Sequence, residues 1–104
     1  MSGLSELGRF SEPAVLIMIS LAAGPKHGYA MQDDIAELAG ERPGPGTLYG
    51  AIRRLEERHY IEALPEQDRR KPYQLTDTGR AALNAELKRM HAVAGTGLRR
   101  LAVA

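Results

Sequence analysis

The sequence predicts a mainly α-helical fold that carries one two-stranded β-hairpin. Four apolar or amphipathic segments are bounded by proline, glycine or capping residues, as helices are. Between the third and the fourth segment, two short stretches alternate apolar and polar residues, which is typical of half-buried strands. A chain of 104 residues suffices for one domain with one core and leaves no room for a catalytic domain beside a regulatory one.

Composition narrows the class of protein further. The hydrophobic fraction of 43% is enough for a globular fold, but so small a core is only marginally stabilising, which favours a dimer. Cysteine is absent, which excludes disulfides and thiolate zinc sites. Residues 1–10 lack the pattern of a signal peptide, and the longest apolar run, Pro13 to Ala23, has about half of the roughly 20 residues that a membrane helix requires. We therefore expect a cytoplasmic protein that does not enter a membrane.

The first segment of the chain leads into a buried helix. Residues 1–12 fit either a loose arm or a short helix that packs on a partner. The helix begins after a cap at Ser11 or Glu12, with Pro13 in its first turn, where the missing N–H of proline costs nothing. Because this helix is apolar all round, we expect burial on both sides, against its own domain and against a second subunit.

A second helix is expected from Gly28 to Ala39, with Gly40 as its stop. Its apolar positions at helical spacing are Met31, Ile35 and Leu38. Its outward-facing positions are expected to be Gln32, Asp33, Asp34 and Glu37.

A third helix is expected from about Pro45 to His59, after a turn at residues 41–44. Its buried stripe comprises Leu48, Ala51, Ile52 and Leu55. Its opposite side comprises Gly46, Tyr49, Arg53 and Glu57. Two helices joined by a short glycine-containing turn form a helix-turn-helix.

The period of the sequence then changes from helical to alternating. Residues 60–64 and 72–75 are predicted to be strands, joined by the polar loop 65–71. This loop is the tip of a hairpin directly after the third helix, which is the position of the wing in a winged helix. The three adjacent bases Arg69, Arg70 and Lys71 form a candidate phosphate-binding footprint on a chain whose 14 basic and 13 acidic residues nearly cancel.

The last helix is capped by Thr76 and carries an apolar stripe. Gly95-Thr96-Gly97 is expected to break or kink it, since each glycine costs roughly 1 kcal/mol in a helix. In so short a chain this stripe is favoured as a dimer seam rather than as core. The predicted dimer interface comprises Leu16, Ile19, Leu83, Leu87, Met90, Leu98 and Leu101. The predicted organisation is thus an arm at residues 1–12, a winged helix-turn-helix domain at 13–76 and a C-terminal dimerisation helix at 77–104.

A winged helix-turn-helix predicts binding to DNA. Residues at the start of the third helix can reach base edges in the major groove, and Arg53, one turn later, can reach guanine or phosphate. Tyr29 fits a phosphate contact and core packing equally well. The candidate DNA-binding residues are Tyr29, Pro45, Gly46, Thr47, Tyr49, Arg53, Arg54, Arg69, Arg70 and Lys71.

Neither catalysis nor metal binding is predicted by any motif. His27, His59 and His91 lie far apart in the chain, without the local spacing of a metal site. The sequence has no Ser-His-Asp pattern, phosphate-cradling glycine loop or paired-carboxylate motif. We therefore expect no enzymatic activity, no cofactor and no metal.

Three motifs resemble the PadR family of bacterial transcriptional regulators: GPKHGY at residues 24–29, GPGTLYGAIRRLE at 44–56 and RRKPYQLTDTGR at 69–80. The resemblance covers about Pro13 to Met90 and is nearest to the small class with a short C-terminal helix. It implies a homodimer in which this helix exchanges across the interface, and a repressor released by a small molecule or by stress. Within it, Thr47, Tyr49 and Arg53 match recognition-helix positions. Tyr29 matches a backbone-contacting tyrosine, and Arg70 and Lys71 match the basic wing.

The sequence departs from the family pattern at Gly44 and Gly50, where serine and proline are common. Tryptophan is absent, so the drug-sandwiching tryptophan pair of some small members is not supported.

Three hypotheses of function stay open at the level of the sequence. The favoured one is a homodimeric repressor that places residues 45–54 of each subunit in successive major grooves of a pseudo-palindromic operator on double-stranded DNA. The near-neutral total charge suggests instead a winged-helix module that binds a protein and has lost DNA binding. A dimer cavity that binds a small hydrophobic or aromatic effector would add to DNA binding.

Overall fold

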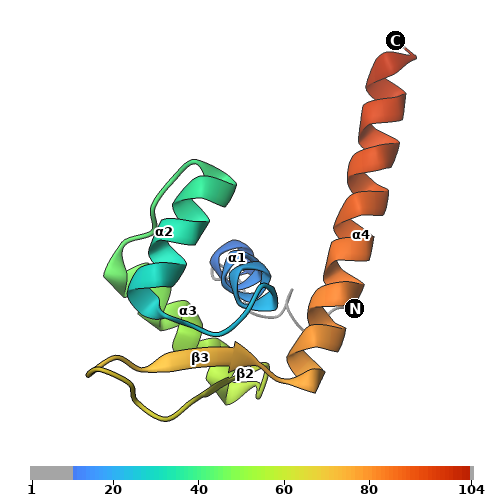
Figure 1. Ribbon diagram of the computed structural model, residues 1–104. Helices are drawn as coiled ribbons and strands as arrows, with labels where there is room; N and C mark the ends of the chain where they lie inside the picture. The colour runs from blue at the N-terminus through green and yellow to red at the C-terminus, as the bar shows by residue number, and fades with distance from the viewer. Residues whose placement is uncertain (1–10, 104) are drawn as a thin grey trace.

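The computed structural model describes residues 11–103 and confirms the predicted fold, a mainly helical winged helix with a long C-terminal helix (Figure 1). The described chain contains the helices α1 (Ser11–Ala22), α2 (Gly28–Ala39), α3 (Pro45–Glu57) and α4 (Asp77–Ala102). Its strands are β1 (Lys26–His27), β2 (Ile61–Ala63) and β3 (Pro72–Leu75). Of the predicted arm at residues 1–12, the first ten residues lie outside the described part, and Ser11 and Glu12 begin α1.

The core is built around α1, which contacts α2, α3, α4 and β3. Its apolar residues are buried on the sides that face these elements, as the sequence predicted. Leu16 and Ile19, which were predicted for the dimer interface, are partly buried and pack against the core. The buried apolar side chains are Ala14, Val15, Ile17, Met18, Leu21, Met31, Ile35, Leu48, Ala51, Ile52, Leu55, Ile61, Tyr73 and Leu83.

Helix α2 has the predicted bounds, but two of its side chains differ from the prediction. Gly40 ends it in the left-handed conformation, with φ of 77°. Leu38 is exposed and does not continue the buried stripe. Gln32, predicted to face outward, is buried because the turn after α2 folds back over it: its Nε2 donates to the Pro43 carbonyl at 2.9 Å.

The sheet has three strands rather than the predicted two, in the order β1-β3-β2 with antiparallel pairing. β1 consists of two residues, which are too few to show an alternating pattern in the sequence. In its pairing with β3, Lys26 lies opposite Tyr73 and His27 lies opposite Pro72. The start of α2 is thereby joined to one arm of the wing.

The tip of the wing is a two-residue turn. Gln67 and Arg70 exchange two backbone hydrogen bonds of 2.8 Å. The residues between them, Asp68 and Arg69, have φ of 50° and 64°. Two left-handed residues in succession characterise the tight hairpin turn whose twist matches that of the strands, and glycine usually occupies at least one of these positions.

Helix α4 begins on a well-fixed corner. The Thr76 hydroxyl oxygen accepts from the Gly79 N–H at 2.9 Å, which confirms the predicted cap, and the hydroxyl donates to the His59 carbonyl at 2.6 Å. Gly79 lies so close to Tyr60 that an added Cβ would come within 2.7 Å of the Tyr60 carbonyl carbon. The first turn of α4 is therefore packed directly on the turn after α3.

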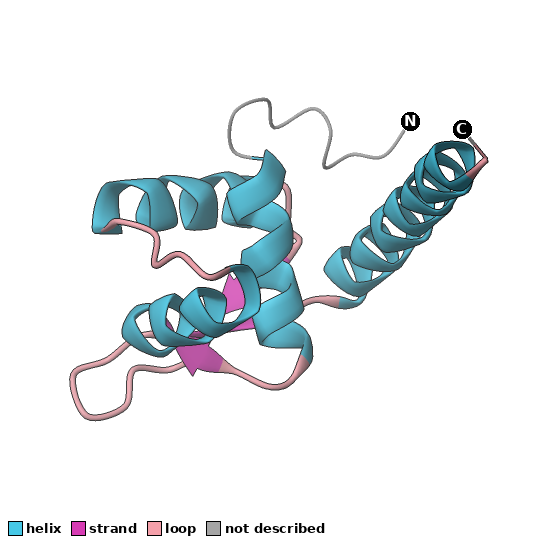
Figure 2. Cartoon of the chain, turned by 90° about the horizontal axis from the view of Figure 1, so that it is seen from above, coloured by secondary structure: helices cyan, strands magenta, loops and turns pink. Residues whose placement is uncertain are grey.

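The expected break at Gly95-Thr96-Gly97 is wrong, because α4 continues through these residues to Ala102. Flanking residues with good helix propensity maintain the backbone hydrogen bonds, and the two glycines only weaken the helix. Figure 2 shows that the C-terminal half of α4 extends away from the other helices and the strands. Within residues 11–103, no helix has both the length and the apolar character needed to cross a membrane.

Candidate nucleic-acid interface

The start of α3 is exposed on the side opposite the core. Leu48, Ile52 and Leu55 are buried, so the helix turns Tyr49 and Arg53 outward. Pro45 occupies the first turn, and the capping residue Gly44 has no side chain to accept a backbone hydrogen bond. The first amides of α3 are thus left without a side-chain cap and are available to an acceptor from outside.

Two tyrosines from different helices lie on the same surface. Tyr29, near the start of α2, is 63% exposed, and Tyr49 of α3 is 49% exposed. Their elements meet at Gly28: a Cβ at this residue would lie 2.8 Å from Cζ of Tyr49. The Tyr49 ring therefore lies against the backbone of α2. Tyr29 is exposed, so it does not belong to the core, which was one of the two interpretations left open by the sequence.

The wing completes this surface. A groove of about 380 Å³ separates it from the starts of α2 and α3. The groove brings together five of the ten candidate residues. The residues that line it are His27, Gly28, Tyr29, Tyr49, Glu66, Arg69, Arg70, Lys71 and Tyr73.

Other candidate residues lie outside this groove. Thr47 lines a separate hollow between α1, the end of α2 and the start of α3. Pro45 and Gly46 are exposed at the tip of α3, and Arg53 and Arg54 are exposed farther along it. The candidate surface therefore consists of a groove and the exposed side of α3 beside it.

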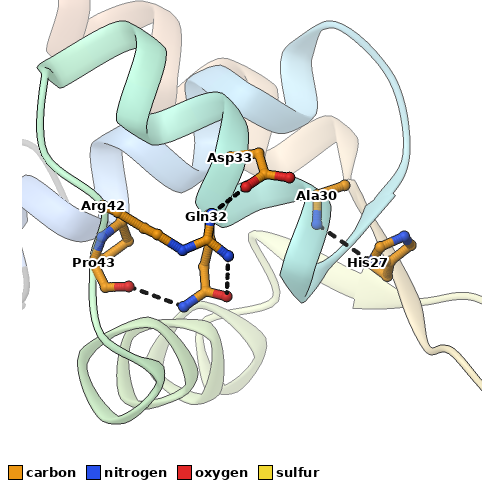
Figure 3. Close-up of polar contacts among 6 residues, drawn as sticks. All are labelled: His27, Ala30, Gln32, Asp33, Arg42 and Pro43. Carbon is orange, nitrogen blue, oxygen red and sulfur yellow. Dashed lines mark hydrogen bonds and ion pairs between the residues drawn. The ribbon is translucent and has the colours of Figure 1, made fainter.

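Arg42 belongs to this surface, although the sequence did not single it out. Its guanidinium carbon lies 4.9 Å from the centre of the Tyr29 ring. Figure 3 shows it between Asp33, with which it forms an ion pair, and Gln32, whose Oε1 accepts from it at 3.3 Å. The hydrogen bond to Asp33 raises the pKa of Arg42. Arg42 is exposed in the turn between α2 and α3, and only the folded turn brings it to Tyr29.

Aromatic and charged groups also meet inside the wing. The Lys71 Nζ lies 5.6 Å from the centre of the Tyr73 ring. Burial raises the pKa of Tyr73, and the positive charge of Lys71 opposes this shift. The Tyr73 ring thus contacts the Lys71 ammonium group, and both residues line the groove.

The predicted dimer residues on α4 divide into two groups. Leu83 is buried in the core of its own chain, and Leu87 is partly buried. Beyond them, Met90, Leu98 and Leu101 are exposed. Val93 is exposed on the same half of the helix and extends this apolar set.

Comparison with known proteins decides the family. The model of the transcriptional regulator PadR-like family matches residues 15–85. The chain belongs to this family. This family is one of transcriptional regulators, as the motifs of the sequence predicted.

One relative of this chain comes from a transposon. An uncharacterized 37.1 kDa protein in a transposon of Streptomyces fradiae is 40% identical over 87 residues, which cover 84% of this chain and 25% of that protein. The chain thus spans a quarter of the length of that relative.

Solved structures have the same fold. A transcriptional regulator from Clostridium thermocellum superposes with a TM-score of 0.76 at 22% identity, covering 95% of this chain and 96% of the other. A PadR family transcription regulator from Clostridium difficile gives 0.76 at 22% identity, covering 86% and 97%. A PadR-like transcription factor from Bacteroides fragilis gives 0.74 at 22% identity, covering 93% and 96%.

Proposed function

We propose that this PadR-like regulator is a homodimeric, sequence-specific repressor that binds a pseudo-palindromic operator in the bacterial cytoplasm. The observation that carries the proposal is the groove between the wing and the helix-turn-helix. Tyr29, Tyr49 and the basic residues of the wing come from three different elements and line this one groove. Exposed aromatic rings beside clustered basic side chains suit a surface that follows a phosphate backbone.

The two parts of the surface have different tasks in this proposal. The exposed side of α3, with Tyr49 and Arg53, enters the major groove and reads base edges. Tyr29 and the basic residues of the wing bind phosphates of the DNA backbone on either side of that major groove. Phosphate contacts supply affinity without sequence information, so they make binding strongly dependent on salt.

A dimer is supported by the exposed apolar residues of α4. Leu98 and Leu101 are 69% and 76% exposed in the single chain. Pairing of this half of α4 with a second copy removes these side chains from water, which is favourable by about 25 cal/mol per Å² of buried apolar surface. A pseudo-palindromic operator requires that this pairing set the two copies of α3 about one turn of DNA apart.

In this proposal an effector releases the repressor from its operator. A small hydrophobic or aromatic molecule, or a stress signal, would act on the interface between subunits, which we place on α1 and α4. Loss of operator affinity on adding such a molecule, at constant protein concentration, is the measurement that establishes it.

The main test is selection of DNA fragments from the genome of the source organism. We expect a discrete set of fragments at about 50 mM salt, with affinity that falls steeply as salt rises. Retention of no fragment would favour the alternative function, a winged-helix module that binds another protein.

Within this proposal, replacing Tyr49 separates base reading from phosphate binding. Tyr49→Ala should weaken binding to the selected fragment about tenfold or more, because base contacts contribute about 1–3 kcal/mol each. Binding to a scrambled duplex should change much less. Fluorescence anisotropy on both duplexes measures this, and equal losses on the two would rule out a role of Tyr49 in base reading.

A further inference from the structure

Both ring nitrogens of His27 lie within hydrogen-bonding distance of other residues. It ends β1 and caps α2, where its Nδ1 accepts from the Ala30 N–H at 3.3 Å (Figure 3). Its Nε2 lies 3.1 Å from Nη1 of Arg70 in the wing. The pairing of His27 with Pro72 holds the backbone of the cap and of the wing together at this point.

These two contacts cannot both be hydrogen bonds. A neutral histidine has one nitrogen that accepts and one that donates, whereas a backbone amide and a guanidinium only donate. The Ala30 N–H is fixed by the helix, and without His27 it would lack its cap. The Arg70 guanidinium is exposed and has further N–H groups that water can satisfy. The acceptor is therefore Nδ1, and the proton is on Nε2.

Two N–H donors of residues that line the groove then face each other. Within residues 11–103, Arg70 forms no ion pair with a carboxylate, unlike Lys26, Arg42 and Arg89, which pair with Asp34, Asp33 and Glu86. Glu66 and Asp68 line the hollows on either side of the pair, but neither accepts a hydrogen bond from it. Within the described chain the pair therefore has no acceptor from the protein, and one anionic oxygen can accept from both donors at once.

We propose that His27 and Arg70 together bind one phosphate of the DNA backbone, with Nε2–H of His27 and the guanidinium donating to its oxygens. This inference rests on the proposed function and adds to it a contact residue that the sequence did not predict. A phosphate oxygen is a strong, charged acceptor, and a guanidinium is well suited to it. His27 thereby links the start of α2 and the wing through a single ligand.

The test uses the full chain and a fluorescein-labelled DNA duplex of mixed sequence, because a phosphate contact needs no operator. His27→Asn keeps the cap, since asparagine is among the best N-capping residues, but its shorter side chain removes the donor at Nε2. We expect an affinity loss of about tenfold to a hundredfold at low salt, as for a hydrogen bond to a charged group, with an unchanged melting temperature. His59→Asn is the matched control, because His59 is exposed with φ of 60°, which asparagine tolerates. It should bind as the wild type does.

A double-mutant cycle tests whether the two residues share one phosphate. Arg70→Gln should lower the slope of log affinity against log salt by about 1, whereas His27→Asn should leave this slope unchanged because it removes no charge. Residues that bind one phosphate should give losses that do not add in the double variant. Strictly additive losses would overturn the inference.

Nitrogen NMR of the wild-type imidazoles gives a readout independent of any variant. We expect an unprotonated Nδ1 and a protonated Nε2 in His27, with the Nε2 signal shifting when the duplex is added. The opposite tautomer, or wild-type affinity in His27→Asn, would show that His27 acts only within the protein and would leave the proposed function standing. Failure of the wild type to bind the duplex would overturn both proposals.

Discussion

The missing side chain at Gly28 determines where the Tyr49 ring lies. Gly28→Ala would place a Cβ 2.8 Å from Cζ of Tyr49 and must push the ring away from α2. Because the displaced ring is half exposed, we expect a change of no more than about 0.5 kcal/mol in the free energy of unfolding. DNA affinity should fall about tenfold, or 1.4 kcal/mol. Thermal denaturation and anisotropy measure the two effects, and unchanged affinity would show that the position of the ring does not matter.

Arg69 occupies a backbone conformation that favours glycine. Its φ of 64° at the tip of the wing costs about 1 kcal/mol or more for a residue with a side chain. Arg69→Gly should therefore raise the free energy of unfolding, by up to about 1 kcal/mol. The same variant should also weaken DNA binding and lower its salt dependence, since it removes a positively charged side chain from the protein's groove. A variant that loses stability would show that the arginine side chain supports the turn.

At this scale the sequence predicts exposure better than contact. Tyr29 and Tyr49 were placed in the candidate site and are both exposed, because the apolar spacing of each helix determines which side faces the core. The burial of Gln32 was not predicted, and Arg42 was not singled out as a site residue. In both cases the contacts arise because the turn after α2 folds back on this helix. The contact of His27 with Arg70 depends on strand pairing and leaves no periodic signal in the sequence.

Among the elements, the helices were predictable and the strand β1 was not. Apolar spacing, together with Gly40 and Thr76 at helix ends, predicts α2 and the start of α4 from local properties. β1 exists only because β3 pairs with it. The expected break in α4 was wrong because two glycines lower helix propensity without enforcing a turn. Local energies thus predict where these helices begin and where α2 ends, but they misjudge the end of α4, and the strand β1 depends on tertiary pairing.

Two glycines of α4 should respond to alanine in opposite ways. A Cβ at Gly79 would collide with the Tyr60 backbone, so Gly79→Ala should lower the free energy of unfolding by about 1–3 kcal/mol. A Cβ at Gly97 would meet no atom within 4 Å, so Gly97→Ala should raise helix stability by up to about 1 kcal/mol. Urea denaturation of both variants measures the contrast. A loss in Gly97→Ala would indicate that another helix approaches closely there.

For the whole molecule, α4 provides the proposed surface for a second copy. The double variant Leu98→Glu/Leu101→Glu should be monomeric, because carboxylates on this side of the helix cannot be buried without a large cost. Sedimentation equilibrium measures the mass, and operator affinity should fall by more than tenfold, since a monomer binds one half-site. Leu38→Glu, at an exposed leucine of α2, is the control and should stay dimeric. A dimeric double variant would exclude this seam.

The projecting half of α4 has a consequence for how the chain responds to its own concentration. Residues 88–103 are exposed apart from the half-buried Gly95 and Thr96, and a helical segment of this length is marginal in water without packing. If a second copy supplies that packing, ordering of this segment and assembly are one equilibrium. Helical content, melting temperature and operator occupancy would then rise together over the same range of protein concentration. The amount of regulator in the cell would act as a signal in its own right, before any effector binds.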